Sequence, residues 1–306
     1  MVTGARGFIG AWVVKVLLEN GRPVVAFDPD PNRDRLRHVL EDNDDDLLVE
    51  IAGDVTDLGQ ITSAITDHRI GAVIHLGALQ VPACAANPSL GARVNVVGTT
   101  NVFLAARDTR LTTPVVFASS VAAVVPDGAD HPTTIYGVFK RANEGTSTLM
   151  WRDEGVASIG LRPHTVYGVG RDQGLTSSPT KAMLYAAAGL PYHIGFGGSF
   201  QMQFGADVAR AFVAAADSEF RGSAVLNLPT PAVDMATVVE AIEAVLPEAA
   251  GSITFDSTPL PFPAKPKVDD TASVFGVISE TPLQDGVEST IRHFQRLLER
   301  GLISPA

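Results

Sequence analysis

The chain has 306 residues, of which 34 are acidic and 23 are basic, so it carries a formal net charge of −11. This acidic balance opposes the attraction to phosphate that supplies most nucleic-acid affinity, and it argues against a nucleic-acid partner. No apolar run is long enough to cross a membrane, because Lys15 interrupts one candidate and Ser119 and Ser120 interrupt another. We therefore expect a soluble protein with no membrane partner and with one large core or two modest ones.

Cysteine usage and the first residues bear on the cellular compartment. Cys84 is the only cysteine, so no internal disulfide can form, and no charged and then apolar leader precedes the first glycines. We expect a cytoplasmic protein.

The first half of the chain alternates short apolar runs, rich in Val and Ile, with longer helical patterns. Helices are predicted at 11–20, which closes on Gly21, and at 88–108 and 136–155. Buried strands are predicted at 23–27, 47–54, 71–78, 114–120 and 157–163. Only Met1 and Val2 precede Thr3, so the first strand is nearly missing. Repeated strand and helix predict an α/β fold, a doubly wound parallel sheet with helices on both faces.

The second half is looser, with Gly- and Pro-rich loops after about Gly168. Helices are predicted near 179–188, 207–217, 234–246 and 286–300. We expect a first domain at 1–168, to which residues 204–230 return, and a smaller C-terminal substrate-binding domain over most of 169–306.

Three glycines, Gly4, Gly7 and Gly10, lie at the predicted turn from the first strand into the first helix. Glycines permit a tight bend and a close approach of backbone amides to a ligand, so this turn suits a pyrophosphate, although any tight turn can use glycine. Asp28 ends the next strand, where a carboxylate can accept hydrogen bonds from an adenosine ribose. The segments 53–57 and 75–78 follow later strands, at the edge where open parallel sheets bind ligands.

Two residues point to different dinucleotides. The carboxylate of Asp28 would repel a 2′-phosphate and favours NAD, whereas Arg6 in the glycine turn could pair with that phosphate and favours NADP. We expect NAD as the cofactor.

Tyr136 and Lys140 are four residues apart at the start of a helical pattern, so both lie on one helix face. Ser119 and Ser120 end a neighbouring strand and place a hydroxyl opposite the phenol. An ammonium about 4 Å away contributes about 4 kcal/mol at an effective dielectric of 20, enough to lower the tyrosine pKa by up to about three units. Such a pair can exchange protons with a substrate hydroxyl near pH 7, while the carbinol releases hydride to a nicotinamide. The alternative is a surface tyrosine beside a solvated lysine.

Together with Asp28, the motifs TGARGFIG, GDVTD, HLGA, VNVVGT, SSVAA, YGVFK and LRPHTVYG resemble the extended short-chain dehydrogenase/reductase family, of the NAD-dependent epimerase/dehydratase type. The resemblance covers nearly the whole chain and implies a Rossmann domain. It implies that Tyr136 is the acid/base, that Lys140 binds the nicotinamide ribose and tunes Tyr136, and that Ser120 orients the reacting oxygen. It also implies cofactor contacts from Gly4, Arg6, Gly7, Phe8, Ile9, Gly10, Asp28, Asp54, Val55, Leu76, Gly77, Ala78, Asn95, Tyr136, Lys140, Pro163 and His164.

The chain departs from the family pattern on the substrate side. Val121 and Ala122 replace the acidic pair that follows the catalytic hydroxyl in dehydratases, which argues against dehydration. Thr165 and Phe200 replace the Asn and Arg that serve the substrate diphosphate in nucleotide-sugar epimerases. We expect Ser120, Thr165 and Phe200 to face a small-molecule substrate that carries no nucleotide.

Conspicuous histidines and Trp12 have ordinary explanations. His75 and Trp12 lie inside apolar elements and are expected in the core. His131, His164 and His193 are scattered without the spacing of metal ligands, so no metal is expected.

Three functional hypotheses remain. The first is an NAD-dependent oxidoreductase that acts on the secondary alcohol or ketone of a small sugar, sugar acid or similar hydroxy compound. The second is a sugar epimerase that keeps NAD bound and returns the hydride to the opposite face. The third is a non-catalytic dinucleotide-sensing protein, against which Ser120, Tyr136 and Lys140 argue.

The helical patterns at 89–107 and 136–153 are apolar on more than one face, which predicts a second neighbour for each helix. That neighbour is either a second subunit, as the family resemblance also implies, or the C-terminal helix near 286–300 of the same chain. We expect a homodimer.

Overall fold

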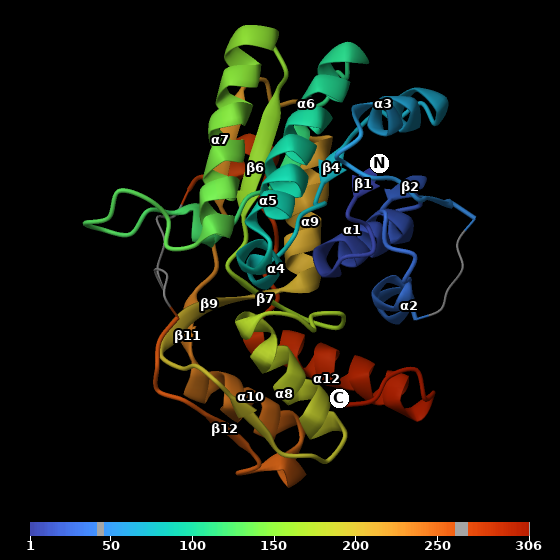
Figure 1. Cartoon of the computed structure of the whole chain (residues 1–306). Helices are drawn as coiled ribbons and strands as arrows, with labels where there is room; N and C mark the ends of the chain where they lie inside the picture. The colour runs from blue at the N-terminus through green and yellow to red at the C-terminus, as the bar shows by residue number, and fades with distance from the viewer. Residues whose placement is uncertain (42–45, 261–268, 306) are drawn as a thin grey trace.

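The computed structural model describes residues 1–41, 46–260 and 269–305 and is built around a parallel sheet (Figure 1). Seven strands lie in the order β10-β6-β5-β4-β1-β2-β3, and every neighbouring pair is parallel. This order confirms the predicted doubly wound, Rossmann-type sheet. The strands are β1 Val2–Thr3, β2 Val24–Phe27, β3 Leu48–Ile51, β4 Ile74–His75, β5 Val115–Ala118, β6 Ser158–Arg162 and β10 Ser223–Asn227.

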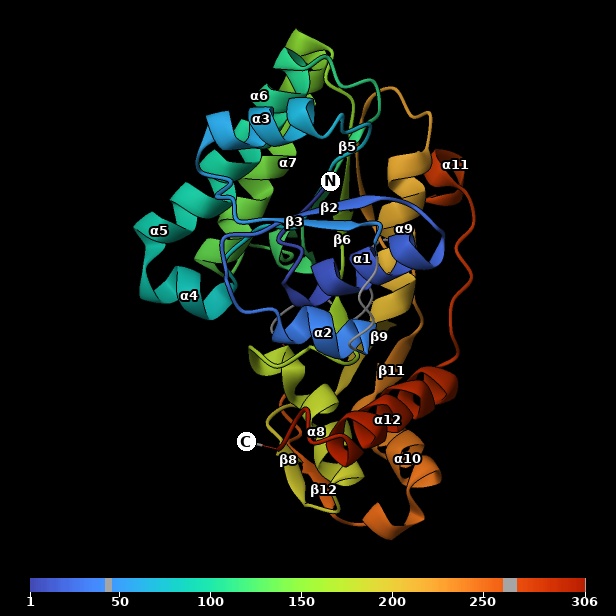
Figure 2. The ribbon, with the colours of Figure 1, turned by 90° about the vertical axis from the view of Figure 1, so that its right-hand side faces the viewer.

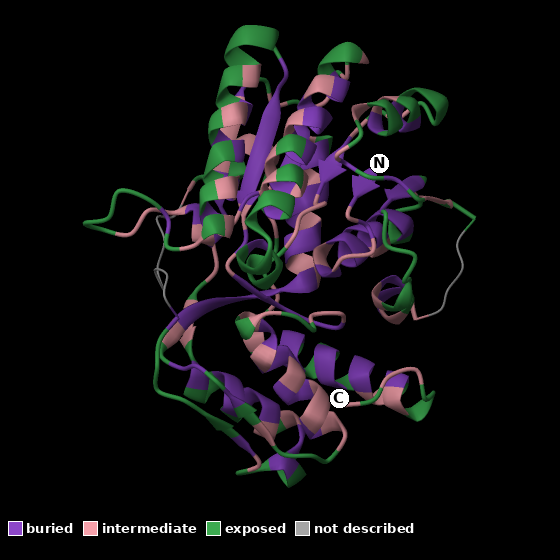
Figure 3. Ribbon diagram, in the orientation of Figure 1, coloured by how far each residue is buried: buried purple, intermediate pink, exposed green. Residues whose placement is uncertain are grey.

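Helices cover both faces of the sheet (Figure 2). On one face α1 packs against α2 and α9, and on the other α6 packs against α3 and α7. Successive strand residues alternate between these two layers: Val24 and Ala26 lie in one core, Val25 and Phe27 in the other. Burial on both faces explains why the strands are continuous apolar runs (Figure 3). The helices are α1 Phe8–Glu19, α2 Asp34–Leu40, α3 Leu58–Asp67, α6 Gly98–Asp108, α7 Ile135–Glu154 and α9 Gly205–Asp217.

The predicted helix at 88–108 is interrupted. It consists of α5 Pro88–Ala92, a π-helical segment at Arg93–Val97 and α6, and the short helix α4 Val81–Ala86 precedes it. The wider π-helical turn contains Asn95, whose amide bonds both backbone groups of Leu79. The interruption therefore ties this helix to the segment that follows β4.

The remaining elements form a smaller group below the sheet in Figure 1. Its helices α8, α10 and α12 pack together, so α12 does not cover α6 or α7, and the alternative of an intrachain cover is wrong. Two small sheets, β11-β9-β7 and β12-β8, complete this group. The elements are β7 Thr165–Tyr167, α8 Ser178–Ala187, β8 Tyr192–Ile194, β9 Ser199–Phe204, β11 Ala232–Asp234, α10 Met235–Val245, β12 Ile253–Phe255, α11 Ala272–Phe275 and α12 Leu283–Glu299.

The second half of the chain also contributes α9 and β10 to the sheet layer. The division into 1–168 with 204–230 and 169–306 stays a prediction. None of the helices in the described ranges combines the length and the apolar character that a bilayer span requires.

The turn between β1 and α1 is closely packed against itself. Gly4 has a φ of 67°, which favours glycine, and the Gly7 amide donates to the Gly4 carbonyl at 3.0 Å. A Cβ added at Gly10 would lie 2.1 Å from that same carbonyl oxygen.

We predict that Gly10→Ala lowers the free energy of unfolding by about 1–3 kcal/mol, because the added methyl group must push the Gly4 carbonyl aside. Gly71→Ala is the control: a Cβ at Gly71 meets no atom within 4 Å, its φ is not positive, and the substitution should stabilise by up to about 1 kcal/mol. Denaturant unfolding measures both, and equal effects of the two substitutions would contradict this packing.

Candidate active site

The predicted site residues meet at the carboxyl ends of the parallel strands. The turn after β1 touches the segment after β4, since a Cβ added at Gly4 would lie 2.6 Å from the Gly77 amide nitrogen. Thr3 also binds this segment, because its carbonyl accepts from Leu76 at 3.0 Å. The glycine turn is therefore fixed against β4, at the switch point of the sheet.

The start of α1 fits a dinucleotide pyrophosphate. Gly7 is the N-cap residue and has no side chain with which to cap the helix. The amides of Phe8, Ile9 and Gly10 lie in the first helical turn, where an α-helix has no carbonyl partners for them. Unpaired amides and the helix dipole together favour a phosphate, so this turn can hold the cofactor.

Asp28 is held with its carboxylate at the end of β2. Its Oδ2 accepts from the Arg6 amide at 3.0 Å, and its Oδ1 accepts from the Asp30 amide at 3.0 Å. These bonds fix the orientation of the carboxylate beside the glycine turn, where the sequence predicted a ribose contact.

The segments after β3 and β4 form the next part of this edge. Asp54 accepts from the Thr56 amide at 2.8 Å, and the side chain of Val55 packs close to Gly77 and Gly98. Leu76, Gly77 and Ala78 lie directly after β4. Direct contacts of these residues with a cofactor stay predictions.

Asn95 is fully buried, and its side chain is used internally. Its Oδ1 accepts from the Leu79 amide at 2.7 Å, and its Nδ2 donates to the Leu79 carbonyl at 2.9 Å. Asn95 therefore holds the segment that follows Ala78. Its position in the VNVVGT motif did not predict this role.

His75 is a core residue, as predicted, and belongs to a chain of buried hydrogen bonds. Its Nδ1 lies 2.7 Å from the Thr3 hydroxyl and its Nε2 3.0 Å from the Thr99 hydroxyl. Thr99 donates to the Asn95 carbonyl at 2.7 Å, so it accepts from Nε2, and Nδ1 accepts from Thr3. Burial lowers the pKa of His75 to about 3, so the ring is neutral. The chain links β1, β4 and the π-helical segment.

The N-terminus of α7 packs against the loop that follows β5. A Cβ added at Gly137 would lie 2.1 Å from the Ala122 carbonyl oxygen, and the Thr134 hydroxyl accepts from the Gly137 amide at 3.0 Å. This packing brings the phenol of Tyr136 close to the side chain of Ser120, which lowers the pKa of Tyr136. The two groups that the sequence predicted to flank a reacting oxygen are therefore adjacent.

The two serines at the end of β5 have different environments. Ser119 is buried and donates to Glu144 Oε1 at 2.6 Å. Ser120 accepts from the Ala122 amide at 3.1 Å and contacts Tyr136. The environment of Ser120 therefore supports its assignment as the reacting serine.

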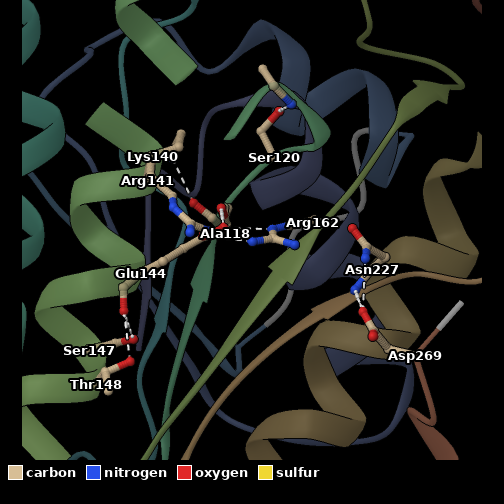
Figure 4. Close-up of polar contacts among 12 residues, drawn as sticks. Ala118, Ser120, Lys140, Arg141, Glu144, Ser147, Thr148, Arg162, Asn227 and Asp269 are labelled. Carbon is tan, nitrogen blue, oxygen red and sulfur yellow. Dashed lines mark hydrogen bonds and ion pairs between the residues drawn. The ribbon is translucent and has the colours of Figure 1, made fainter. Parts of the chain in front are cut away.

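Lys140 differs from its predicted position. Its Nζ donates to the Ala118 carbonyl at 2.7 Å and lies 5.5 Å from the centroid of the Tyr136 ring (Figure 4). Burial lowers the pKa of Lys140 to about 8 and raises the pKa of Tyr136 to about 12. The predicted fall in the tyrosine pKa is therefore wrong for this state, because the ammonium lies over the ring and the loss of water around the phenol dominates.

Glu144, one helical turn after Lys140, is the centre of a buried ion-pair network. Arg162 from β6 donates to both of its carboxylate oxygens, at 2.6 and 2.7 Å, and Arg141 donates at 3.1 Å (Figure 4). With the bond from Ser119, this network joins α7 to β5 and β6. It fixes the helix face that carries Tyr136 and Lys140.

The predicted residues beyond β6 divide between loop and core. The Pro163 carbonyl accepts from the Val121 amide at 3.1 Å, and the His164 amide donates to Gln203 at 2.8 Å. Thr165 and Phe200 have no exposed surface, and Phe200 packs edge-to-face on Phe196 at 5.4 Å. Contrary to expectation, neither of these two side chains presents surface to a substrate, because both are enclosed in the protein, Phe200 in the same core as Phe196.

Arg171 is a cation near Tyr136 that the sequence analysis missed. Its guanidinium lies 5.9 Å from the centroid of the Phe8 ring, and its Nη2 donates to Thr176 at 2.8 Å. Its Nε is buried and has no partner in the described part of the chain. Its charge lowers the pKa of Tyr136, against the larger effect of burial. A guanidinium with an unpaired donor here suits an anionic ligand.

We predict that Lys140→Met raises the free energy of unfolding of the cofactor-free protein at pH 7 by about 1–3 kcal/mol, because it removes a buried charge. Below pH 8 the lysine is charged in both folded and unfolded states, so the full cost is present. Between pH 8 and 10.5 the folded protein loses the proton first, so the difference between variant and wild type should shrink. Thermal and denaturant unfolding against pH test this, with the partly exposed Lys15→Met as control. A gap that stays constant with pH would refute the buried charge.

Comparison with known proteins shows the family to which this chain belongs. A profile described as the NAD dependent epimerase/dehydratase family matches residues 1–228. UDP-glucuronate 4-epimerase 4 of Arabidopsis thaliana is 30% identical over 183 residues, which are 55% of this chain and 41% of that protein. An uncharacterised protein of Methanocaldococcus jannaschii is 30% identical over 184 residues, 55% of this chain and 56% of that protein. The chain spans about half the length of the curated relatives it matches.

Solved structures share the fold across nearly the whole chain. UDP-glucose 4-epimerase of Thermotoga maritima, solved with UDP-glucose, superposes with a TM-score of 0.80 at 22% identity, over 97% of this chain and 98% of that chain. MoeE5, solved with UDP-glucose and NAD, gives a TM-score of 0.77 at 28% identity, with coverage of 97% and 98%. Because the family profile covers residues 1–228, which include the glycine turn and the helix with Tyr136 and Lys140, this chain belongs to the NAD-dependent epimerase/dehydratase family of extended short-chain dehydrogenases/reductases.

Proposed function

We propose that the protein is an NAD-dependent oxidoreductase that transfers hydride between NAD and the secondary alcohol or ketone of a small sugar, sugar acid or similar hydroxy compound. One observation carries the proposal: the hydroxyls of Ser120 and Tyr136 meet at the strand edge that also holds the glycine turn. A proton-transfer group and a dinucleotide turn at one edge are what alcohol oxidation requires.

The residues of this chain supply the proton chemistry. Bound NAD would accept a hydride from the alcohol carbon, and NADH would return one. Tyr136, with a pKa near 12 in the cofactor-free protein, is protonated at neutral pH and can donate its proton to a carbonyl oxygen during reduction. In oxidation the reverse step needs the phenolate form of Tyr136, which takes the hydroxyl proton, and Ser120 donates a hydrogen bond to the same oxygen. Lys140 adds a positive charge beside the ring, which stabilises the phenolate.

The preference for NAD over NADP is supported by the surroundings of Asp28. Its carboxylate is fixed at the ribose position by two backbone amides, and the side chain of Arg6 is paired with Glu50 at 2.8 Å. The acidic group favours a free ribose 2′-hydroxyl over a 2′-phosphate.

A substrate without a nucleotide is supported by Thr165 and Phe200, which replace diphosphate-binding residues and lie in the core. Within the proposed class, Arg171 favours a compound with an acidic group. The Nε of Arg171 has no acceptor among the described residues, and the charge of Arg171 lowers the pKa of Tyr136. A sugar acid would supply the missing carboxylate.

An epimerase is the second candidate, and the names of the relatives favour it. UDP-glucuronate 4-epimerase 4 is the name of the Arabidopsis relative. The same Tyr136 and Ser120 would serve, with hydride returned to the opposite face of the ketone. A dinucleotide sensor without activity is disfavoured by the retained Ser120, Tyr136 and Lys140. A cytoplasmic location belongs to the proposal and is supported by the single cysteine.

A panel of substrates decides between these functions. Polyols, aldonates, uronates and nucleotide sugars are incubated with NAD, and NADH absorbance and product stereochemistry are recorded. NADH formed with a small hydroxy compound supports the oxidoreductase. A nucleotide sugar whose configuration is inverted at one carbon, without net formation of NADH, identifies the epimerase instead.

We predict that Tyr136→Phe lowers kcat by about 10²–10⁴-fold and changes the NAD dissociation constant by severalfold at most, because only the proton-transfer hydroxyl is lost. Tyr185→Phe, on α8 against Tyr192, is the control and should keep activity. Near wild-type turnover by Tyr136→Phe would overturn the mechanism.

We also propose a homodimer that pairs α5, α6 and α7 across a two-fold axis. Exposed apolar side chains lie on α5, on the π-helical segment that leads into α6 and on α7: Leu90, Val97, Val138 and Leu149 are each 42–48% exposed. An apolar face of this kind on two neighbouring helices is typical of a subunit interface.

Light scattering at micromolar concentration should give about twice the chain mass of 32.2 kDa. Leu149→Glu should shift the mass to that of one chain, because a carboxylate would be buried at the interface. Val277→Glu is the control, since Val277 is 85% exposed on a different part of the surface. A wild-type mass near 32.2 kDa would refute the dimer.

A further inference from the structure

A cluster of charged residues surrounds the proposed ribose position, and one member has no place in the family motif. Arg6 follows β1, Asp28 follows β2, and Glu50 lies within β3. The two strands that carry the acidic residues are neighbours in the sheet (Figure 2). Glu50 pairs in register with Ala26, which belongs to the core under α1, so an apolar residue would suit its position.

Each of the three guanidinium nitrogens of Arg6 donates to a protein group. Its Nε donates to Glu50 Oε2 at 3.1 Å and its Nη2 donates to the same oxygen at 2.8 Å. Its Nη1 donates to the Asp30 carbonyl. The side chain is only 11% exposed, so the pair is well shielded from solvent.

Glu50 also binds a second cation. Its other carboxylate oxygen pairs with Arg33, just before α2, and the glutamate side chain is 18% exposed. One carboxylate therefore occupies both arginines that lie near Asp28 in this cluster.

We propose that Glu50 determines the selectivity for NAD over NADP by holding Arg6 away from the adenosine 2′ position. This inference rests on the proposed function, because it requires dinucleotide binding at the glycine turn. A ribose 2′-phosphate needs a guanidinium partner, and Arg6 is the residue of the turn that could provide one. While Glu50 retains Arg6, the 2′-phosphate would face Asp28 without a cation to balance it.

The geometry separates this role from NAD binding itself. Asp28 is oriented by the backbone amide of Arg6, not by its side chain. Loss of Glu50 therefore leaves the ribose contact and the glycine turn unchanged. It frees the Arg6 side chain to turn toward the phosphate.

Calorimetric titration tests the proposal with four ligands: NAD, NADP, ADP-ribose and 2′-phosphorylated ADP-ribose. Glu50→Gln should bind the 2′-phosphorylated ligands about 10- to 100-fold more tightly than wild type, the equivalent of one or two charge-assisted hydrogen bonds. Its affinity for NAD and ADP-ribose should change by severalfold at most. The double variant Arg6→Ala with Glu50→Gln should lose the gain, because the freed guanidinium is then absent.

Glu288→Gln is the matched control. It makes the same change in net charge on α12, where Glu288 pairs with Arg292, and should leave all four affinities unchanged. Circular dichroism and thermal unfolding test whether each variant is folded. If Glu50→Gln does not fold, Glu50→Thr replaces it in the titrations.

Three outcomes overturn the inference: unchanged affinity of a folded Glu50 variant for 2′-phosphorylated ligands, an equal gain in the double variant, or a gain in Glu288→Gln. Failure of the proposed function gives a different result, in which wild type and every variant bind none of the four ligands. That result would overturn the assignment to Glu50 as well.

Discussion

The contact between Gly4 and Gly77 is the constraint on which the rest of the structure depends. The first strand has only two residues, so it cannot position the following turn by its own length. The turn is fixed instead by its close approach to the end of β4 and by the bond from the Gly4 amide to the Phe27 carbonyl at 2.9 Å. A side chain at Gly4 would separate β1 from β4, because its Cβ would lie 2.6 Å from the Gly77 amide nitrogen. That separation would also displace the start of α1, where the cofactor amides lie.

The helix α7, which carries Tyr136 and Lys140, meets the same edge through a second close approach, between Gly137 and the Ala122 carbonyl. The ion pairs of Glu144 then hold the rest of α7 on the sheet. Lys140 is buried in this arrangement at a cost to stability, and burial also raises the pKa of Tyr136. The protein thus retains an unfavourable charge where its proposed chemistry needs one, a compromise common at active sites.

The fold could be predicted from the sequence because parallel strands buried on two faces and amphipathic helices leave clear periodic patterns. The glycine turn, Ser120, Tyr136 and Lys140 were predictable from local motifs. The direction of the Tyr136 pKa shift was not predictable, because it depends on whether the Lys140 ammonium reaches the phenol oxygen or the ring. Arg171 and Glu50 were missed because neither lies in a motif, and only the fold brings them to the site. Phe200 was placed in the pocket because alignment gives position without showing which way a strand faces.

The seventh strand of the sheet comes from far along the chain. β6 pairs with β5 on one side and with β10 on the other, and β10 ends at Asn227. During synthesis the outer edge of β6, with its buried residues Ile159 and Leu161, therefore has no strand beside it until residue 227 has left the ribosome. An unpaired apolar edge is a template for intermolecular strand pairing. The long separation of β6 from β10 along the chain therefore extends the period in which this edge is open to pairing with another chain.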